Sequence, residues 1–140
     1  MAFSLHPRLA GGSLPVGDLS ITRVLLKDDC RWPWLILVPQ RADLRELHDL
    51  DASDYAAAAG DIRRASAAMA GLEGVAKVNV GALGNEVPQL HVHVVGRWPG
   101  DAAWPGPVWG VAGKIAYPPD EADLRLAALR AALGVAAPQG

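Results

Sequence analysis

Residues 89–95 read Gln-Leu-His-Val-His-Val-Val, and polar and apolar side chains alternate strictly up to residue 94. This period of two is typical of a β-strand, because successive side chains in a strand point to opposite faces of the sheet. The apolar set requires a hydrophobic layer and consists of Leu90, Val92 and Val94. The polar set shares the other face, at about 6.5–7 Å between neighbours, and consists of Gln89, His91 and His93.

Two imidazoles so close together have three interpretations from the residues alone. They belong to a solvated strand face, or they supply two ligands of a zinc or iron site, or one of them attacks an electrophile. The metal site needs a third ligand, and the candidates (His6, His48, Cys30 or a carboxylate) stand at no recognised spacing. Covalent catalysis suits imidazole, whose pKa lies near neutral pH and which is a good nucleophile.

The rest of the chain predicts an α+β domain. The expected strands span residues 20–27, 34–38, 75–80 and 89–95. The expected helices span 56–70 and 120–133, with one helical turn within 43–50 and an irregular lead-in over 4–18. Strands that follow one another through short connections favour an antiparallel sheet with helices on one face.

The long helix has its own start signal and a candidate buried stripe. Asp51 or Ser53 can cap its N-terminus, and the alanines that follow are strong helix formers. Spacings of three and four predict a stripe that consists of Tyr55, Ala59, Ile62, Ser66 and Met69.

Length and charge exclude several functional classes. A chain of 140 residues suggests a single domain over residues 1–140. Thirteen basic and fifteen acidic residues form no basic stripe, so we expect no nucleic-acid polymer as a partner. No apolar run reaches the roughly 18 residues of a membrane span, and the N-terminus has no signal-peptide pattern. The single cysteine, Cys30, is typical of a reducing cytoplasm, where we expect the protein to act.

The segment 89–95 resembles the signature of the histidine-triad (HIT) superfamily, His-φ-His-φ-His-φ-φ, where φ is apolar. It is similar to a bacterial subgroup in which glutamine takes the first position. The resemblance covers about residues 4–110, including the Gly-Asn loop before the segment and the Trp-Pro loop over 98–110. It implies a HIT-like antiparallel sheet of about five strands, with one long helix and a C-terminal helix.

The resemblance also implies roles for the segment. His91 occupies the position of the nucleophile, which becomes nucleotidylated in this superfamily. His93 is expected to contact the phosphate oxygens and to assist the leaving group. Gln89 can donate a hydrogen bond to a phosphate oxygen or to a neighbouring imidazole, but it cannot carry a proton charge. No metal and no cofactor are implied.

Three further residues are expected at the substrate. Asn79 matches a superfamily asparagine near the phosphate, or it is a hydrogen-bonding residue at a strand end, and Asp28 lies near the position of the ribose-binding residue. Trp104 or Trp109 packs over the sheet or closes over the nucleotide, and we take Trp104 as the candidate. Many members carry another histidine at positions that hold Trp34 and Ala42 here.

Two functions follow from these observations. The first is a hydrolase or nucleotidyl transferase that acts at the α-phosphate of a nucleoside polyphosphate (diadenosine polyphosphate type) or of a phosphoramidate, through a covalent nucleotidyl-histidine. The alternative is a nucleotide-binding HIT module with little or no catalysis. The resemblance further implies a homodimer.

Overall fold

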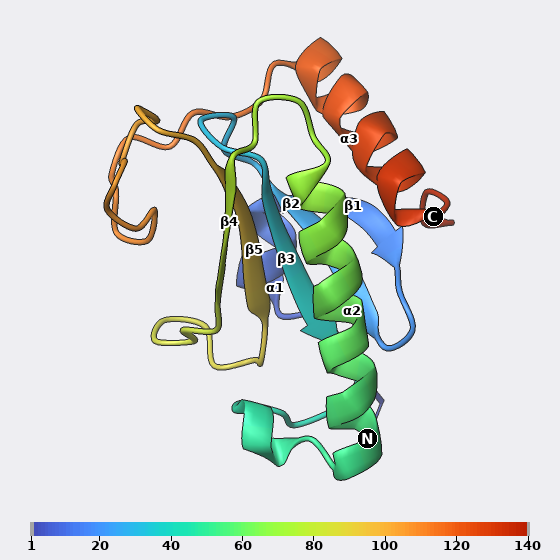
Figure 1. The fold of residues 1–140 in the computed structure, drawn as a ribbon. Coiled ribbons are helices and arrows are strands. Elements are labelled where there is room, and N and C mark those ends of the chain that lie inside the picture. Colours follow the sequence, from blue (N-terminus) through green and yellow to red (C-terminus); the bar gives the residue numbers. More distant parts are fainter. Residues whose placement is uncertain (1, 140) are drawn as a thin grey trace.

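The computed structural model describes residues 2–139 and contains one open antiparallel sheet flanked by helices (Figure 1). The strands are β1 (Ser13–Asp18), β2 (Thr22–Lys27), β3 (Trp34–Pro39), β4 (Lys77–Gly81) and β5 (Val92–Arg97). The helices are α1 (Pro7–Gly11), α2 (Ala52–Ala70) and α3 (Pro119–Leu133), with a short 3₁₀ turn, η1, at Leu47–Asp49. Within the described residues the five strands run in the order β1-β2-β3-β5-β4. The predicted α+β class and antiparallel sheet are confirmed.

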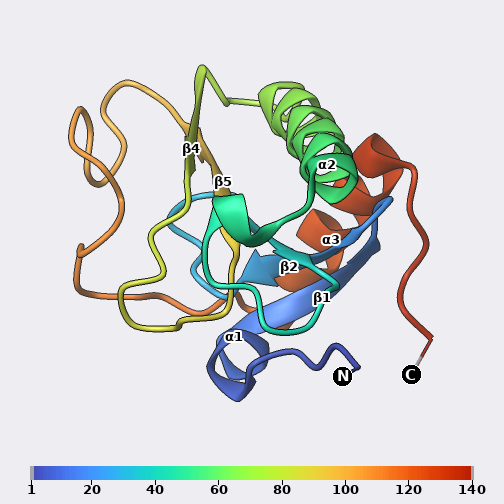
Figure 2. The same ribbon diagram turned by 90° about the horizontal axis from the view of Figure 1, so that it is seen from below.

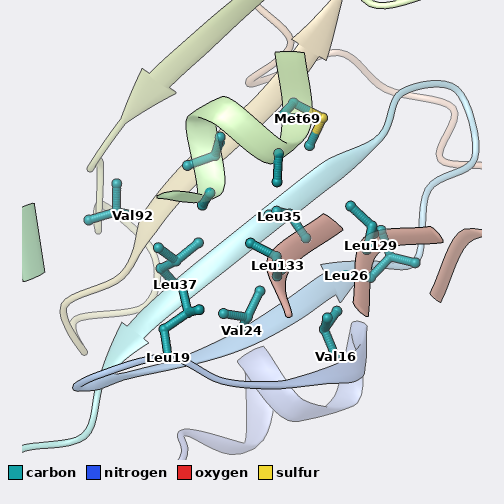
Figure 3. Packing of buried hydrophobic residues seen from close by; sticks show 13 residues of the cluster. Val16, Leu19, Val24, Leu26, Leu35, Leu37, Met69, Val92, Leu129 and Leu133 are labelled. Atoms are coloured by element: carbon teal, nitrogen blue, oxygen red, sulfur yellow. The ribbon is translucent and has the colours of Figure 1, made fainter. Parts of the chain in front are cut away.

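Each face of the sheet carries its own hydrophobic layer. The helices α2 and α3 cover one face, whereas α1 and the N-terminal segment lie on the other (Figure 2). Figure 3 shows the first layer, in which Leu35, Leu37 and Val92 of the sheet lie with Met69 of α2 and Leu129 of α3. The second layer is built around tryptophans and consists of Leu9, Leu25, Trp32, Trp34, Ile36, Val38, Val95 and Val108.

Strand β5 divides its side chains between these layers as alternation requires. Val92 and Val94 belong to the layer under α2. His93 pairs with Ile36 of β3, a residue of the second layer, so its imidazole faces away from α2. The strand begins at Val92, which leaves Gln89 and His91 in the irregular stretch just before it.

The irregular lead-in predicted for residues 4–18 is wrong. It contains α1 and the edge strand β1. The register of β1 against β2 shifts between Pro15 and Gly17. Proline and glycine in a strand usually mark an edge or a bulge, and this strand has both features. Their presence concealed a short strand that pairs on one side only.

The stripe predicted for α2 is also wrong except at Met69, although the helix and its Asp51 cap are confirmed. The buried residues are Ala58, Asp61, Ala65, Ala68 and Met69, while Tyr55 is exposed. Asp61 is buried because its carboxylate accepts hydrogen bonds from the backbone and hydroxyl groups of Ser20 and Thr22. These bonds fasten the helix to the β1–β2 turn and outweigh the cost of burying a charge.

Candidate active site

The two histidines of the β5 segment lie side by side. Their ring centroids are 4.9 Å apart and their planes are inclined at 69°. Only 6% of His91 and 7% of His93 is exposed, so both rings are held in a largely dry environment. The sheet therefore presents two imidazoles together to whatever binds on the face opposite α2.

Hydrogen bonds give the two rings opposite tautomers. Nδ1 of His91 lies 2.6 Å from the carbonyl oxygen of Gln89, and a carbonyl can only accept. Nδ1 of His91 therefore carries the hydrogen, and Nε2 of the neutral ring is a free lone pair. In His93, by contrast, Nδ1 accepts from Nε1–H of Trp34 at 2.9 Å. The hydrogen of neutral His93 is thus on Nε2, which is a donor.

His93 stays neutral over the physiological range. Burial, followed by the neighbouring charges of His91 and Lys27, lowers the pKa of His93 to about 3. The ring is also enclosed by indoles, with the centroids of Trp34 and Trp109 at 5.7 Å and 5.6 Å. Lys27 sits with Nζ 4.2 Å from the centroid of Trp34, and burial lowers the pKa of this lysine as well.

A cavity of about 540 Å³ opens beside the imidazoles. Its volume lies within the range of small-molecule sites, roughly 300–1,000 Å³. The apolar part of the wall includes Leu9, Trp34, Ile36, Val108 and Trp109. The loop from Leu83 to Val87 forms another side. The cavity therefore combines aromatic and aliphatic walls with two imidazoles, a composition suited to a base or nucleoside beside a reactive group.

Positive charge predominates on the polar part of the wall, which includes Arg8, Lys27, Arg31 and Lys114. The acidic residues are Asp29 and Glu86. Asp29 is neutralised by Arg31, whose Nε and Nη2 donate to its carboxylate at 3.0 and 2.8 Å. Burial alone would raise the pKa of Asp29, but the Arg31 hydrogen bonds outweigh it and lower that pKa. The remaining cations favour an anionic ligand.

The structure does not bring Gln89 to the cavity wall. Its Oε1 accepts from the backbone N–H of His6 at 2.8 Å, and its Nε2 donates to the carbonyl of Ser4 at 2.9 Å. Both ends of the amide are thus engaged by the N-terminal segment. The expectation that this amide meets a phosphate has no support in the geometry.

Three other candidates also lie outside the residues that line the cavity. Asn79 Oδ1 accepts from Arg97 at 2.8 Å, within a buried network that joins β4, β5 and the following loop. Asp28 accepts from the backbone N–H of Tyr117 and so anchors the segment before α3. Trp104 stacks over the guanidinium of Arg97, at 5.6 Å. In place of Asp28 and Trp104, their neighbours Asp29 and Trp109 line the cavity.

Comparison with protein-family models matches the HIT domain over residues 15–100, which is more than half of the chain. The protein belongs to the HIT domain family. No curated protein matches the chain at a significant level.

Crystal structures of three histidine triad proteins resemble this HIT domain over nearly their full length. The protein from Bradyrhizobium japonicum is 44% identical, with a TM-score of 0.92 and coverage of 95% of this chain and 99% of that one. The protein from Sinorhizobium meliloti is 43% identical, with a TM-score of 0.90 over 92% and 96% of the two chains. The protein from Marinobacter aquaeolei is 40% identical, with a TM-score of 0.93 over 96% and 98%.

Trp34 and Lys27 were missed as site residues, although the sequence carried a signal for each. Trp34 occupies a position where many HIT members carry a histidine. Its indole nevertheless has a function, because its N–H sets the tautomer of His93. Lys27 follows Leu25 at a spacing of two in β2. Since Leu25 belongs to the tryptophan layer, alternation directs Lys27 to the histidine face.

Among the described residues, the remaining histidines and the cysteine of this HIT protein are not grouped as a metal site. Across residues 2–139, no three His, Cys, Asp or Glu side chains are grouped so that they could hold a metal ion. His48 is exposed and lies 3.9 Å from Asp49, while His6 caps α1 by accepting from the N–H of Arg8. Among the described helices, none is long and apolar enough to cross a membrane.

Proposed function

We propose that this HIT protein is a nucleotidyl hydrolase or transferase that acts at the α-phosphate of a nucleoside polyphosphate (diadenosine polyphosphate type) or phosphoramidate, with His91 as the nucleophile. The observation that carries the proposal is the tautomer pair. Nε2 of His91 has a free lone pair, because Nδ1 donates to the Gln89 carbonyl. Nε2 of His93 has a hydrogen to donate, because Nδ1 accepts from Trp34. A nucleophile and a donor thus stand side by side on one cavity.

The reaction has two steps. Nε2 of His91 forms a bond to the α-phosphorus, and the bond from phosphorus to the leaving group breaks. Water or another acceptor then forms a bond to the phosphorus, and the P–N bond to His91 breaks. Positioning and charge stabilisation supply most of the catalysis in such transfers. Here His93 Nε2–H and the cations of the wall provide the charge stabilisation.

The proposal also covers the subgroup of the protein, the ligand of its cavity, its cellular location and its oligomeric state. Gln89 in the first triad position supports placement in the glutamine subgroup. The walls of Trp34, Trp109 and Ile36 suit a base or nucleoside. A cytoplasmic location, which the single cysteine favours, and a homodimer complete the proposal. No cofactor enters the reaction as proposed.

The nucleophile is tested by replacing it. We expect His91→Ala to release no AMP from diadenosine tetraphosphate or adenosine phosphoramidate, because the Nε2 lone pair that bonds to the phosphorus is lost. When the reaction of the wild-type protein is stopped without acid, which would cleave the P–N bond, mass spectrometry should detect an adenylyl adduct on His91. His48→Ala is the matched control, since His48 is exposed, and it should retain wild-type turnover.

The second function, a nucleotide-binding module with little catalysis, is favoured by one observation. The first triad position holds Gln89, whose amide is engaged by the backbone of the N-terminal segment and brings no charge to the site. Under this alternative, AMP raises the melting temperature while no assay detects turnover.

For the first function, full turnover by His91→Ala would reject the assignment of His91 as the nucleophile.

A further inference from the structure

We infer that Gln89 is a positioning residue, which holds the N-terminal segment against the stretch that carries His91 and His93. In this way Gln89 places Arg8 at the cavity, where Arg8 binds the anionic part of the substrate beyond the α-phosphate. This inference rests on the proposed function, because it names how the same cavity recognises the remainder of the substrate. The HIT resemblance assigns Gln89 a hydrogen bond to the phosphate or to an imidazole, and it assigns Arg8 no role.

The amide of Gln89 recognises a backbone. Its acceptor binds the N–H of His6 and its donor binds the carbonyl of Ser4, two groups on one short extended stretch. Glutamine supplies a donor and an acceptor at every pH, whereas an imidazole offers both only in its neutral form. The partners are more than 80 residues away along the chain, so these two bonds define where the N-terminal segment lies.

The segment is fixed again a few residues later. The side chain of His6 caps α1, and its carbonyl accepts from the N–H groups of Leu9 and Ala10. Leu9 is 6% exposed and belongs to the tryptophan layer. Arg8 stands between the Gln89 bonds and the buried Leu9, so its backbone has little freedom. Both Arg8 and Leu9 line the cavity that holds His91 and His93.

Arg8 is available to bind a ligand. Its one ion pair in the described chain is a 3.9 Å contact with Glu86, and the two side chains are 62% and 84% exposed. Such an exposed and distant pair contributes little. By contrast, the guanidinium of Arg31 on the same cavity is occupied by Asp29 and by backbone carbonyls. A largely exposed guanidinium on the wall of a cavity matches the geometry of phosphate oxygens, which it can bind in a bidentate manner.

The experiment compares AMP with α,β-methylene-ATP, which carries two further phosphates and cannot be cleaved at the α-phosphate. Calorimetry without metal measures both affinities for the wild type, Arg8→Ala, Gln89→Met and the double variant. We expect Arg8→Ala to weaken α,β-methylene-ATP about tenfold, as for a lost charge-assisted hydrogen bond. AMP should change by less than about twofold, because Arg8 lies beyond the α-phosphate in this inference.

Two comparisons keep the test specific to positioning. Gln89→Met should weaken α,β-methylene-ATP as Arg8→Ala does, and the double variant should be no weaker than Arg8→Ala alone, because Gln89 acts through Arg8. Arg8→Lys should restore part of the loss. Arg63→Ala, which removes an exposed arginine of α2 outside the cavity, is the control and should match the wild type.

The outcomes separate this inference from the proposed function. Equal losses for AMP and α,β-methylene-ATP, or losses that add in the double variant, overturn the inference while the proposed function stands. If Gln89→Met does not fold, wild-type affinity of Arg8→Ala for α,β-methylene-ATP overturns it by itself. If neither nucleotide binds the wild type, the proposed function fails and the inference fails with it.

Discussion

The chemistry of the site depends on two imidazoles that differ although they are neighbours. His91 donates through Nδ1 to a backbone carbonyl, and His93 accepts through Nδ1 from an indole. A protonated His93 would place N–H against N–H at the Trp34 contact and a positive charge near Lys27. The same surroundings that make His93 a reliable donor through Nε2 therefore keep it from titrating near neutral pH.

This has a measurable effect on stability. The pKa of His93 is lowered to about 3, whereas an unfolded histidine has a pKa of about 6.5, so between these values the unfolded chain takes up a proton that the folded chain does not. Stability therefore falls as pH falls through this window. For this one group the loss from pH 7 to pH 5 should be about 2 kcal/mol. Urea unfolding at several pH values measures it.

His93→Gln is the comparison that isolates the effect. It removes the titrating ring but keeps a polar side chain, so the dependence of stability on pH between 5 and 7 should become shallower. The lowered carboxyl pKa values, such as that of Asp61, act at lower pH and leave this window unaffected. An identical slope in His93→Gln and wild type would contradict the neutral assignment.

At the level of elements, α2 can approach β5 closely because position 96 has no side chain. A Cβ at Gly96 would lie 2.8 Å from Pro33 Cγ, 2.8 Å from Val75 Cγ2 and 2.9 Å from Met69 Sδ. Three contacts below van der Waals distance cannot all be relieved by one rotation. The glycine thus sets the spacing between the helix layer and the strand that carries His93.

Gly96→Ala should destabilise the protein by about 1–3 kcal/mol, the usual cost of overpacking a core. The matched control is Gly71→Ala at the end of α2, where a Cβ meets only ordinary contacts at 3.6 Å and φ is negative. That change should stabilise by about 0.4–1 kcal/mol through the unfolded chain. Urea denaturation of both variants decides, and equal midpoints would refute the close packing.

The elements also show what could be predicted from sequence. The strands over 20–27 and 34–38 were predictable because they are apolar and β-branched, and His91 and His93 because alternation marks them. Edge strand β1 was not, since Pro15 and Gly17 interrupt its pattern. The buried face of α2 could not be predicted either, because its alanines give almost no amphipathic contrast. Its buried polar residue, Asp61, is explained only by its hydrogen-bond partners on the β1–β2 turn.

Among the site residues, too, local patterns identified the histidines but not the side chains that tertiary contacts bring to the cavity. Gln89, Asn79 and Asp28 are polar residues that alternation or the HIT resemblance places at the substrate, yet each is engaged by the protein itself. Arg8 and Lys114 reach the cavity from segments far from residues 89–95 in the chain. Their placement depends on tertiary contacts that no local pattern encodes.

At the scale of the whole molecule, the two edges of the sheet differ. On the free side of β1, Arg130 of α3 donates to the carbonyls of Pro15 and Val16, each at 2.9 Å. The other edge is β4, which among the strands of residues 2–139 pairs with β5 alone. Val80 of β4 is 48% exposed. An open edge with an exposed apolar side chain can pair with another strand, so we place the proposed homodimer contact at β4.

The dimer contact is tested by a charge at this edge. If two β4 strands meet, sedimentation velocity of the wild type should give twice the 14.7 kDa chain mass, and Val80→Lys should give the monomer. A lysine on an edge strand opposes pairing through its charge and hydration, and because Val80 is already exposed, the fold of each chain should persist. Leu124→Lys on α3 is the control: Leu124 is 72% exposed, so the dimer should remain. A wild-type monomer, or a Val80→Lys dimer, would exclude β4 as the interface.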